Sequence, residues 1–364
     1  MLTARVAIIG GGLSGLYAAA LLEARGLHDY VLLEARETFG GRILSLPAAS
    51  SAGGRFDLGA TWFWPGLQPE LARVVGELGL TTFEQYEAGD MLIDRARTQP
   101  PTRVDGYASM SPALRIVGGM GALIDALKQR LSPEKLLSGA CVRRGIAHGG
   151  HVEVAVDGLR GDARSYRVDR VLLATPPRLA VSTIEFTPTL PDALALQWRR
   201  SPTWMAPHAK YVAVFDRPFW REQGLSGEAR SAVGPLAEIH DASSPGGHAA
   251  LFGFLGIPAA VRSRVHEAEL LAHCRAQLER LFADAAALPR AEFLKDWAND
   301  PRTAVAADLT ADAHHAVRLS STAPSGAWQN RLIGIASEWS PNFSGYVAGA
   351  VDAARRGVEA SMAA

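Results

Sequence analysis

The residues best suited to chemistry lie in the first forty-two positions, where a glycine turn precedes an acid. Gly10, Gly12 and Gly15 form a G-x-G-x-x-G motif directly after the apolar run 5–9. Such glycines permit a tight turn and a close backbone approach to a pyrophosphate, and the N-terminus of the following helix attracts negative charge. Glu34 follows at the offset of about 20 residues expected for an acid that binds a ribose hydroxyl. The motif predicts dinucleotide contacts from Gly10, Gly12, Leu13, Ser14, Gly15 and Glu34.

A second motif follows at once, E-A-R-E-T-F-G-G-R over 34–42. Its glycines permit another close backbone approach, and Arg42 offers a planar fork of donors that can neutralise phosphate charge. The alternative for Arg42 is a solvated surface arginine. Arg36 is a candidate for stacking on an adenine. These considerations add Ala35, Arg36, Gly41 and Arg42 to the expected cofactor contacts.

Together the two motifs resemble the flavin amine oxidase superfamily, which includes monoamine oxidases, polyamine oxidases and L-amino-acid oxidases. The resemblance covers nearly the whole chain and implies FAD rather than NAD. It implies an α/β fold, with a Rossmann-type, glutathione-reductase-like FAD domain and a smaller α+β substrate domain. The expected FAD domain is discontinuous, at 1–79, 116–201 and 298–364, and the substrate domain comprises 80–115 and 202–297.

The hydrophobic pattern predicts the elements that position these residues. Expected strands cover 5–9, 30–33, 171–174, 209–215, 250–255, 293–297 and 331–336, with a hairpin at 140–146 and 151–156. Expected helices cover 16–25, 69–78, 122–131, 259–282 and 346–362. The stretch 81–94 alternates like a strand, and 97–106 is predicted to be a polar loop.

The segment between Gly79 and Gly118 is short compared with the long, mostly helical insertion of the family. That insertion forms much of the lid over the substrate entrance. The flavin face is therefore either more open here or covered by another subunit, which leaves a homo-oligomer as an option.

The resemblance implies hydride transfer from a primary or secondary amine to flavin N5, with O₂ reoxidising the flavin and releasing H₂O₂. The imine product then gives an aldehyde or ketone. Because free alkylamines have pKa values near that of lysine, about 10, an apolar pocket favours the uncharged form. Lys210, within 207–220, resembles the lysine that holds a water against N5. The alternative is a lysine that extends along apolar surface to solvent.

Further site residues follow from the resemblance. Tyr346 resembles one wall of the family's aromatic cage, and Trp297 resembles a tryptophan on the flavin face; core aromatics are the alternatives. Glu338 resembles the acid that binds the ribityl or phosphate region. The remaining cofactor contacts implied are Gly59, Ala60, Thr61, Trp62, Val142, Thr175, Trp297, Gly345 and Tyr346.

Two positions depart from the family pattern. The second cage tyrosine, ten residues after Trp297, is Ala307, so Trp62 or Trp339 would have to complete the cage. The preceding position, where mitochondrial monoamine oxidases attach FAD through a cysteine, is Ala306. The sequence therefore predicts non-covalent FAD.

Trp62 also bears on the substrate. In L-amino-acid oxidases of this superfamily an arginine at the corresponding place binds the substrate carboxylate. Tryptophan cannot form that ion pair, so a simple amine is the expected substrate unless Arg103 or Arg302 serves as the clamp.

The composition limits the partners, the cellular location and the metal sites that can be expected. Lys plus Arg (37) balance Asp plus Glu (37), which argues against nucleic acid or an anionic membrane as a partner. No apolar run reaches the roughly 18 residues of a spanning helix. Cys141 and Cys274 form no metal or redox motif, and a cytoplasmic protein is expected. His314 and His315 have no partners at metal-ligand spacing, so no metal is expected.

Two alternative functions remain open from the sequence. One is a flavin-dependent C–C desaturase or dehydrogenase of the same fold. The other is a flavin-binding protein without amine turnover.

Overall fold

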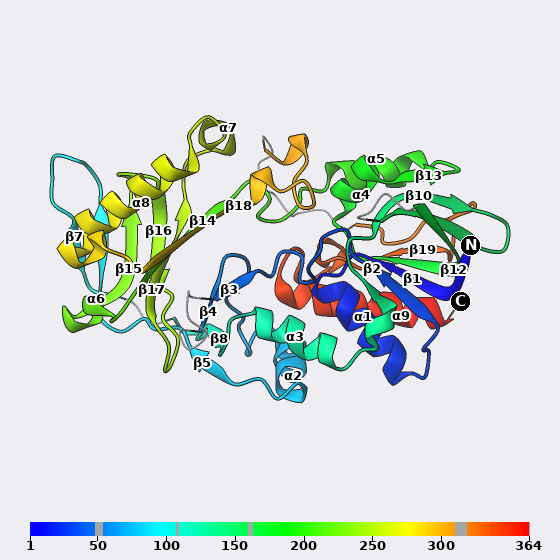
Figure 1. The fold of residues 1–364 in the computed structure, drawn as a ribbon, viewed down its shortest axis with the longest axis horizontal. Coiled ribbons are helices and arrows are strands. Elements are labelled where there is room, and N and C mark those ends of the chain that lie inside the picture. Colours follow the sequence, from blue (N-terminus) through cyan, green and yellow to red (C-terminus); the bar gives the residue numbers. More distant parts are fainter. Residues whose placement is uncertain (48–53, 107–108, 159–162, 310–318, 364) are drawn as a thin grey trace.

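Two large sheets form the two ends of the molecule (Figure 1). The computed structural model describes residues 1–47, 54–106, 109–158, 163–309 and 319–363. The first sheet has the order β13-β10-β11-β12-β1-β2-β9, and β19 pairs with the end of β12 on the edge opposite β1. Its strands are β1 (Leu2–Ile9), β2 (Tyr30–Leu33), β9 (Leu136–Leu137), β10 (Cys141–Ala147), β11 (Val152–Asp157), β12 (Ala163–Leu173), β13 (Glu185–Thr187) and β19 (Leu332–Gly334).

The second sheet has the order β18-β14-β17-β16-β15-β6-β7. Its strands are β6 (Asp90–Asp94), β7 (Thr102–Val104), β14 (Ala209–Phe215), β15 (Leu225–Ser231), β16 (Leu236–Asp241), β17 (Ala249–Leu255) and β18 (Ala291–Asp296). Two small antiparallel pairs join β3 (Ser45–Pro47) to β4 (Arg55–Asp57) and β5 (Thr82–Glu84) to β8 (Leu114–Ile116).

Helices lie on both sides of the first sheet, and α8 runs along the second sheet (Figure 1). They are α1 (Leu13–Ala24), α2 (Pro69–Glu77), α3 (Gly121–Gln129), α4 (Pro177–Thr183), α5 (Asp192–Arg200), α6 (Phe219–Glu222), α7 (Ala259–Arg262), α8 (Glu267–Phe282) and α9 (Val347–Ala363). Short 3-10 turns are η2 (Pro133–Lys135), η3 (Asp284–Ala287), η4 (Trp297–Asn299), η5 (Ala306–Asp308) and η6 (Ser337–Trp339).

The centre of the first sheet is parallel. β1 lies between β2 and β12, with Val6 opposite both Tyr30 and Arg170. Helices α1, α3 and α9 pack on one face, and α4 and α5 pack on the other. Because both faces are covered, the inner strands are continuous apolar runs. The parallel arrangement brings the carboxyl ends of β1, β2 and β12 to one edge, where dinucleotides bind in folds of this type.

The second sheet buries both faces of β14. Tyr211 and Ala213 pack against α8, whereas Val212 and Val214 face Phe56 and the segment that follows β4. Side chains alternate along a strand, so Lys210 points to the same side as Val212. Lys210 is only 2% exposed, which excludes the solvent-reaching alternative.

The structure corrects three sequence expectations. The helix expected over 259–282 is broken into α7 and α8. No proline or glycine marks the break; the buried guanidinium of Arg262 draws the turn toward β18 by binding Asp296 (2.7 and 2.9 Å) and the carbonyl of Pro207 (2.8 Å). The expected loop 97–106 contains β7, and 81–94 divides into β5 and β6 of different sheets. Within the described part of 80–115, every regular element is a strand.

Candidate active site

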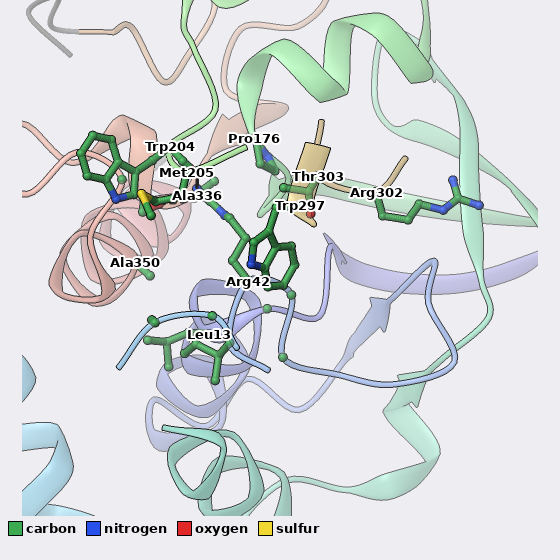
Figure 2. Close-up of a pocket in the computed structure, with 18 of the residues that line it drawn as sticks. Leu13, Arg42, Pro176, Trp204, Met205, Trp297, Arg302, Thr303, Ala336 and Ala350 are labelled. Carbon is green, nitrogen blue, oxygen red and sulfur yellow. Dashed lines mark hydrogen bonds between the residues drawn. The ribbon is translucent and has the colours of Figure 1, made fainter. Parts of the chain in front are cut away.

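A cavity of about 670 Å³ has walls from both sheets, within the size range of cofactor and ligand pockets. Figure 2 shows Trp204, Met205 and Ala350 on one side of Arg42, and Arg302 on the opposite side. The cavity brings together Lys210, Tyr346, Trp297 and Trp62. It is also lined by the cofactor candidates Gly10, Gly12, Leu13, Ser14, Glu34, Ala35, Arg36, Gly41, Arg42, Gly59, Ala60, Thr61, Val142, Thr175 and Gly345.

Two sequence candidates lie behind this lining. Gly15 is inside α1, where a Cβ would come within 2.0 Å of the carbonyl oxygen of Gly10. Glu338 is the middle residue of the turn η6, and its fully buried side chain contacts Arg42. Both therefore shape the cavity through a neighbour that lines it.

The glycine turn leaves room for a bulky anionic group. Gly12 caps α1 without any side-chain hydrogen bond, and the first N–H groups of a helix have no acceptor within it. A Cβ on Gly41, where φ is +61°, would lie 3.3 Å from the Cα of Gly12. The two glycine segments thus approach each other at a distance that only glycine permits.

Glu34 is held in place by the backbone. Its Oε2 accepts a hydrogen bond from the N–H of Gly11 (2.6 Å), and its Oε1 accepts one from the N–H of Arg36 (2.8 Å). The carboxylate is therefore oriented at the end of β2 before any ligand binds. It lies between the two glycine motifs that the sequence connects with one cofactor.

Arg42 forms a two-point ion pair with Glu338 at 2.6 and 3.0 Å. Arg42 also donates to the carbonyl of Trp204 (3.3 Å) and to Ser337 Oγ (3.2 Å). Burial alone would raise the pKa of Glu338, but the positive charge and hydrogen bonds of Arg42 hold that pKa below its usual value. The pair supplies an ionised carboxylate and an oriented guanidinium at the cavity wall.

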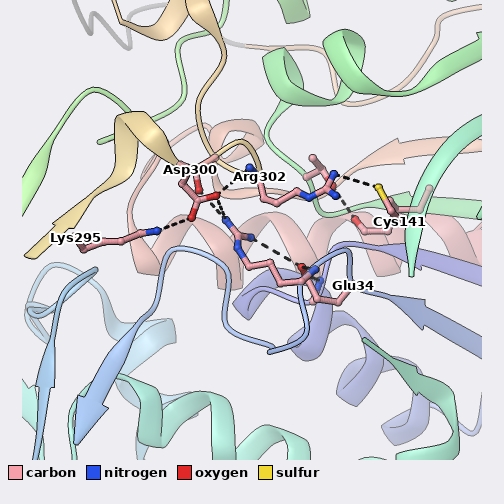
Figure 3. Close-up of polar contacts among 10 residues, drawn as sticks. Glu34, Cys141, Lys295, Asp300 and Arg302 are labelled. Atoms are coloured by element: carbon pink, nitrogen blue, oxygen red, sulfur yellow. Dashed lines mark hydrogen bonds and ion pairs between the residues drawn. The ribbon is translucent and has the colours of Figure 1, made fainter. Parts of the chain in front are cut away.

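Arg36 links the end of β2 to the segment after β18, where Figure 3 shows the contact between Lys295 and Asp300. Its Nη2 donates to Asp300 Oδ1 and to Thr303 Oγ1, both at 2.9 Å, and Lys295 binds Asp300 Oδ2 at 2.7 Å. Burial would raise the pKa of Asp300, but the hydrogen bond from Lys295 and the charge of Arg36 lower it. The charge of Arg36 is therefore shared with Asp300, and adenine stacking by Arg36 stays a prediction.

Of the two arginines considered as carboxylate clamps, Arg302 lines the cavity and Arg103 does not. Arg302 lines the cavity beside Cys141, whose Sγ is 3.1 Å from its Nη1 (Figure 3). Arg103 binds Asp90 and the carbonyls of Gln223 and Gly224, and it is not part of the cavity wall.

Lys210 places a buried amino group in the cavity wall. Its Nζ donates to Thr61 Oγ1 (2.5 Å) and to the carbonyl of Gly59 (3.3 Å), and it lies 3.9 Å from the ring centre of Phe252. Burial lowers the pKa of Lys210 to about 7, opposed by the negative charge of Asp57. A large fraction of Lys210 is therefore neutral near pH 7.

Three sequence-predicted aromatic residues occupy the cavity wall in different settings. Trp62 donates from Nε1 to Gln85 Oε1 (2.7 Å) and packs edge-on against His240. Trp297 donates to the carbonyl of Leu58 (3.0 Å) and is 5% exposed. Tyr346 is 43% exposed and stacks on Trp204.

Trp339, considered from the sequence as a replacement cage wall, is a core residue. It packs against Trp198 with ring centres 5.1 Å apart and donates to the carbonyl of Ser320 (3.1 Å). A Cβ at Gly334 would lie 2.3 Å from its ring, so the absence of a side chain there admits the indole. The aromatic partner of Tyr346 is Trp204, which the sequence analysis did not single out.

A family model described as flavin containing amine oxidoreductase matches residues 82–360, and one described as an NAD(P)-binding Rossmann-like domain matches residues 8–78. The chain belongs to the flavin-containing amine oxidoreductases. It is therefore an FAD-dependent oxidoreductase of the α/β class that acts on amines, as the motifs predict.

Individual relatives agree with this membership. A probable flavin-containing monoamine oxidase A of Dictyostelium discoideum is 23% identical over 70% of this chain and 75% of its own length. Putrescine oxidase of Kocuria rosea is 24% identical over 71% of this chain and 76% of its own length.

Solved structures share the fold at low identity. Wild-type putrescine oxidase bound to putrescine has a TM-score of 0.80 at 20% identity, with all of both chains covered. Cyclohexylamine oxidase from Brevibacterium oxydans IH-35A has a TM-score of 0.79 at 19% identity, with 98% of each chain covered.

The donor set of the cavity fits the FAD of this amine oxidoreductase family. An uncapped helix N-terminus, an oriented Glu34 and the guanidinium of Arg42 suit a pyrophosphate and a ribose, and the two adjacent glycine segments leave space for them. When bound, FAD supplies the two-electron oxidation of the substrate and the return of electrons to O₂.

Sequence reasoning missed Trp204, the Thr61–Lys210 hydrogen bond and the Asp300 bridge. No motif marks Trp204, because its role depends on a contact with Tyr346, 142 positions away. The described residues contain no group of three or more His, Cys, Asp or Glu placed to hold a metal, and His314 and His315 lie outside them. Among the same residues, no helix is both long and apolar enough to span a membrane.

Proposed function

We propose that this chain oxidises simple primary or secondary amines that carry no α-carboxylate, with non-covalently bound FAD and release of H₂O₂. One observation carries the proposal: a buried lysine with a pKa near 7 lies in the same cavity as six aromatic side chains and a dinucleotide-binding turn. Such a cavity favours a neutral amine, because burial penalises its charged form.

Lys210 is proposed to hold and exchange a proton beside the reacting amine. Its Nζ is fixed by Thr61 and by the carbonyl of Gly59, so its position depends on the segment that passes the cavity after β4. A pKa near the working pH lets a group both accept and donate a proton. A water bound to Nζ would be oriented by the same contacts.

Trp62, Trp297 and Tyr346 are proposed to form the apolar boundary of the amine site. The three residues line the cavity, and the indole N–H groups of Trp62 and Trp297 are satisfied by Gln85 and Leu58. Their ring surfaces therefore contribute to the site without unpaired donors. Apolar ring surfaces favour the uncharged amine over its ammonium form.

The charges along the wall support an amine rather than an amino acid. Glu238 lines the cavity, and its pKa is lowered by the hydrogen bond from His240. An ionised carboxylate in the wall opposes the entry of a substrate carboxylate. Arg103 lies outside the wall, and the guanidinium of Arg302 contacts Cys141 Sγ, so neither is proposed as a carboxylate clamp.

Cofactor binding is proposed to use both glycine segments, Glu34, Arg42, Thr175 and Val142. Arg42 presents the phosphate-binding fork while Glu338 orients it from behind. Ala306 begins the turn η5 and carries no group that could bond covalently to a flavin. Non-covalent FAD is the consequence.

The domain boundaries 1–79, 116–201 and 298–364 against 80–115 and 202–297 remain part of the proposal. A cytoplasmic location rests on the cysteines, because Cys141 and Cys274 are both unpaired. Burial raises the pKa of Cys274 to about 12, as in an unreactive core thiol. A homo-oligomer in which another subunit covers the short lid is kept as the proposed explanation for the exposed ring of Tyr346.

The decisive experiment is an anaerobic amine panel on the purified holoenzyme. Amines should bleach the flavin absorbance, air should restore it, and peroxide should appear in stoichiometric amount. Denaturation should release all of the flavin into the supernatant. Bleaching by no amine would contradict amine oxidation, and colour retained by the precipitated protein would contradict non-covalent binding.

A further inference from the structure

Trp204 and Tyr346 stack on each other in the cavity wall. Their ring centres are 5.6 Å apart with an angle of 28° between the planes, and both residues line the cavity. Ala307, which occupies the expected place of a second tyrosine, lies outside the wall, and its carbonyl accepts a hydrogen bond from Arg178 (3.2 Å). The second ring therefore comes from the connection between α5 and β14.

The backbone around Trp204 is held from several sides. The N–H of Thr203 donates to Asp308 Oδ1 (3.0 Å), and the carbonyl of Trp204 accepts from Arg42 (3.3 Å). Met205 has a φ of +61°, a conformation that non-glycine residues adopt only where surrounding contacts impose it. This tethering indicates that the indole has a defined place rather than a solvated surface role.

Gly345 makes the close approach of Trp204 possible. A Cβ at Gly345 would lie 2.5 Å from the Cβ of Trp204, so any other residue would displace the indole. The residue next to Gly345 is Tyr346, on which the indole stacks. One glycine thus determines the contact between the two rings.

The spacing of the rings determines how a substrate can use them. Carbon atoms in contact are about 3.5–4.0 Å apart, so a substrate between two facing rings needs roughly twice that separation. Rings stacked with centres 5.6 Å apart leave no such space. Trp204 and Tyr346 therefore act as one stacked pair in a single wall, in contrast to two opposed walls that enclose an amine.

We propose that Trp204 is a specificity-determining residue that selects amines with a flat aromatic substituent, which packs on the wall it forms with Tyr346. The inference rests on the proposed amine oxidation and adds the residue that recognises the substituent. Offset or edge-to-face packing of aromatic rings contributes beyond buried area alone. A saturated ring of the same carbon count gains the burial but lacks that contribution.

The test compares 2-phenylethylamine with 2-cyclohexylethylamine in the holoenzyme. We expect Trp204→Leu to reduce the phenyl-over-cyclohexyl ratio of kcat/KM by about 2- to 10-fold, the equivalent of an aromatic contact of roughly 0.5–1.5 kcal/mol. Trp204→Phe should retain most of the ratio. Trp198→Phe is the matched control: Trp198 packs on Trp339 in the core, so this change should leave the ratio unaltered.

Binding of a ligand that is not oxidised separates recognition from turnover. The flavin spectrum should report tighter binding of 2-phenylethanol than of 2-cyclohexylethanol, and Trp204→Leu should remove this difference. An unchanged kcat/KM ratio in Trp204→Leu would overturn the proposal, as would loss of FAD affinity with selectivity intact. If no amine is oxidised but alcohol selectivity still depends on Trp204, the proposed activity fails while the aromatic recognition stands.

Discussion

Arg42 and Glu338 are 296 residues apart in sequence and meet through both terminal nitrogens of the guanidinium, Nη1 and Nη2, and both oxygens of the carboxylate. The Glu338 side chain is fully buried, whereas the Arg42 side chain keeps 25% of its surface exposed. The pair therefore joins the second glycine motif to the turn before α9 and leaves one side of Arg42 toward the cavity. Each of the two side chains therefore holds the other in position.

Arg42→Ala should weaken FAD binding. A charge-assisted contact to phosphate contributes roughly 1.5–3 kcal/mol, so we expect a dissociation constant about 10- to 150-fold higher. The apoprotein should also lose stability, because Glu338 is left buried without its partner. Equilibrium dialysis and chemical denaturation measure the two effects.

The double variant Arg42→Ala with Glu338→Ala is the control for this pair. Removing both charges should restore part of the stability but none of the FAD affinity, since the phosphate contact comes from Arg42. Unchanged FAD affinity in Arg42→Ala would show that this guanidinium does not reach the pyrophosphate.

Lys210→Met should keep the fold and the flavin but slow turnover by about 10²-fold, the lower range for loss of a positioned proton-transfer group. Methionine preserves most of the side-chain volume in the buried site. Lys295→Met is a matched control, because Lys295 is opposite Lys210 in the sheet but binds Asp300 instead. Stopped flow measures the rates of both half-reactions. Wild-type rates in Lys210→Met would show that Lys210 has a structural role only.

Stability should rise with pH because of Lys210. In the folded protein its pKa is about 7, below the ordinary lysine value, so above pH 7 the unfolded chain binds the additional proton. The contribution of Lys210 to the free energy of unfolding is lowest below pH 7. It rises with pH until this lysine also loses its proton in the unfolded chain. Between pH 7 and 9 the gain should be about 2 kcal/mol.

Urea denaturation of wild type and Lys210→Met, both saturated with FAD, measures this contribution. The free energy of unfolding of Lys210→Met should increase less between pH 7 and 9 than that of the wild type. Equal slopes in the two proteins would mean that Lys210 keeps its proton when folded.

Trp62 should make the enzyme prefer amines to α-amino acids. A carboxylate that enters beside Trp62 would be buried without a partner, at a cost of several kcal/mol. At about 1.4 kcal/mol per tenfold, the preference in kcat/KM should reach at least two orders of magnitude. Trp62→Arg should reduce the preference for amines over α-amino acids. Comparable wild-type rates for an amine and the corresponding amino acid would contradict the proposed role of Trp62.

Local signals account for the positions of the residues that the sequence assigns to the cofactor. The turn from β1 to α1, Glu34 at the end of β2 and the segment around Arg42 depend on spacing and glycine content within one supersecondary unit, which the sequence displays directly. The same holds for β14, where period-two alternation places Lys210 on one face. The sequence alone left open whether that face is solvent or interior.

Tertiary contacts decided the rest. Burial of Lys210 requires the segment after β4 to cover it, and the pairing of Trp204 with Tyr346 requires Gly345 and the Asp308 contact to meet in space. The break between α7 and α8 likewise depends on Arg262 reaching Asp296. Local patterns record backbone preference and face polarity, whereas ion pairs and ring contacts depend on residues that only the folded chain brings together.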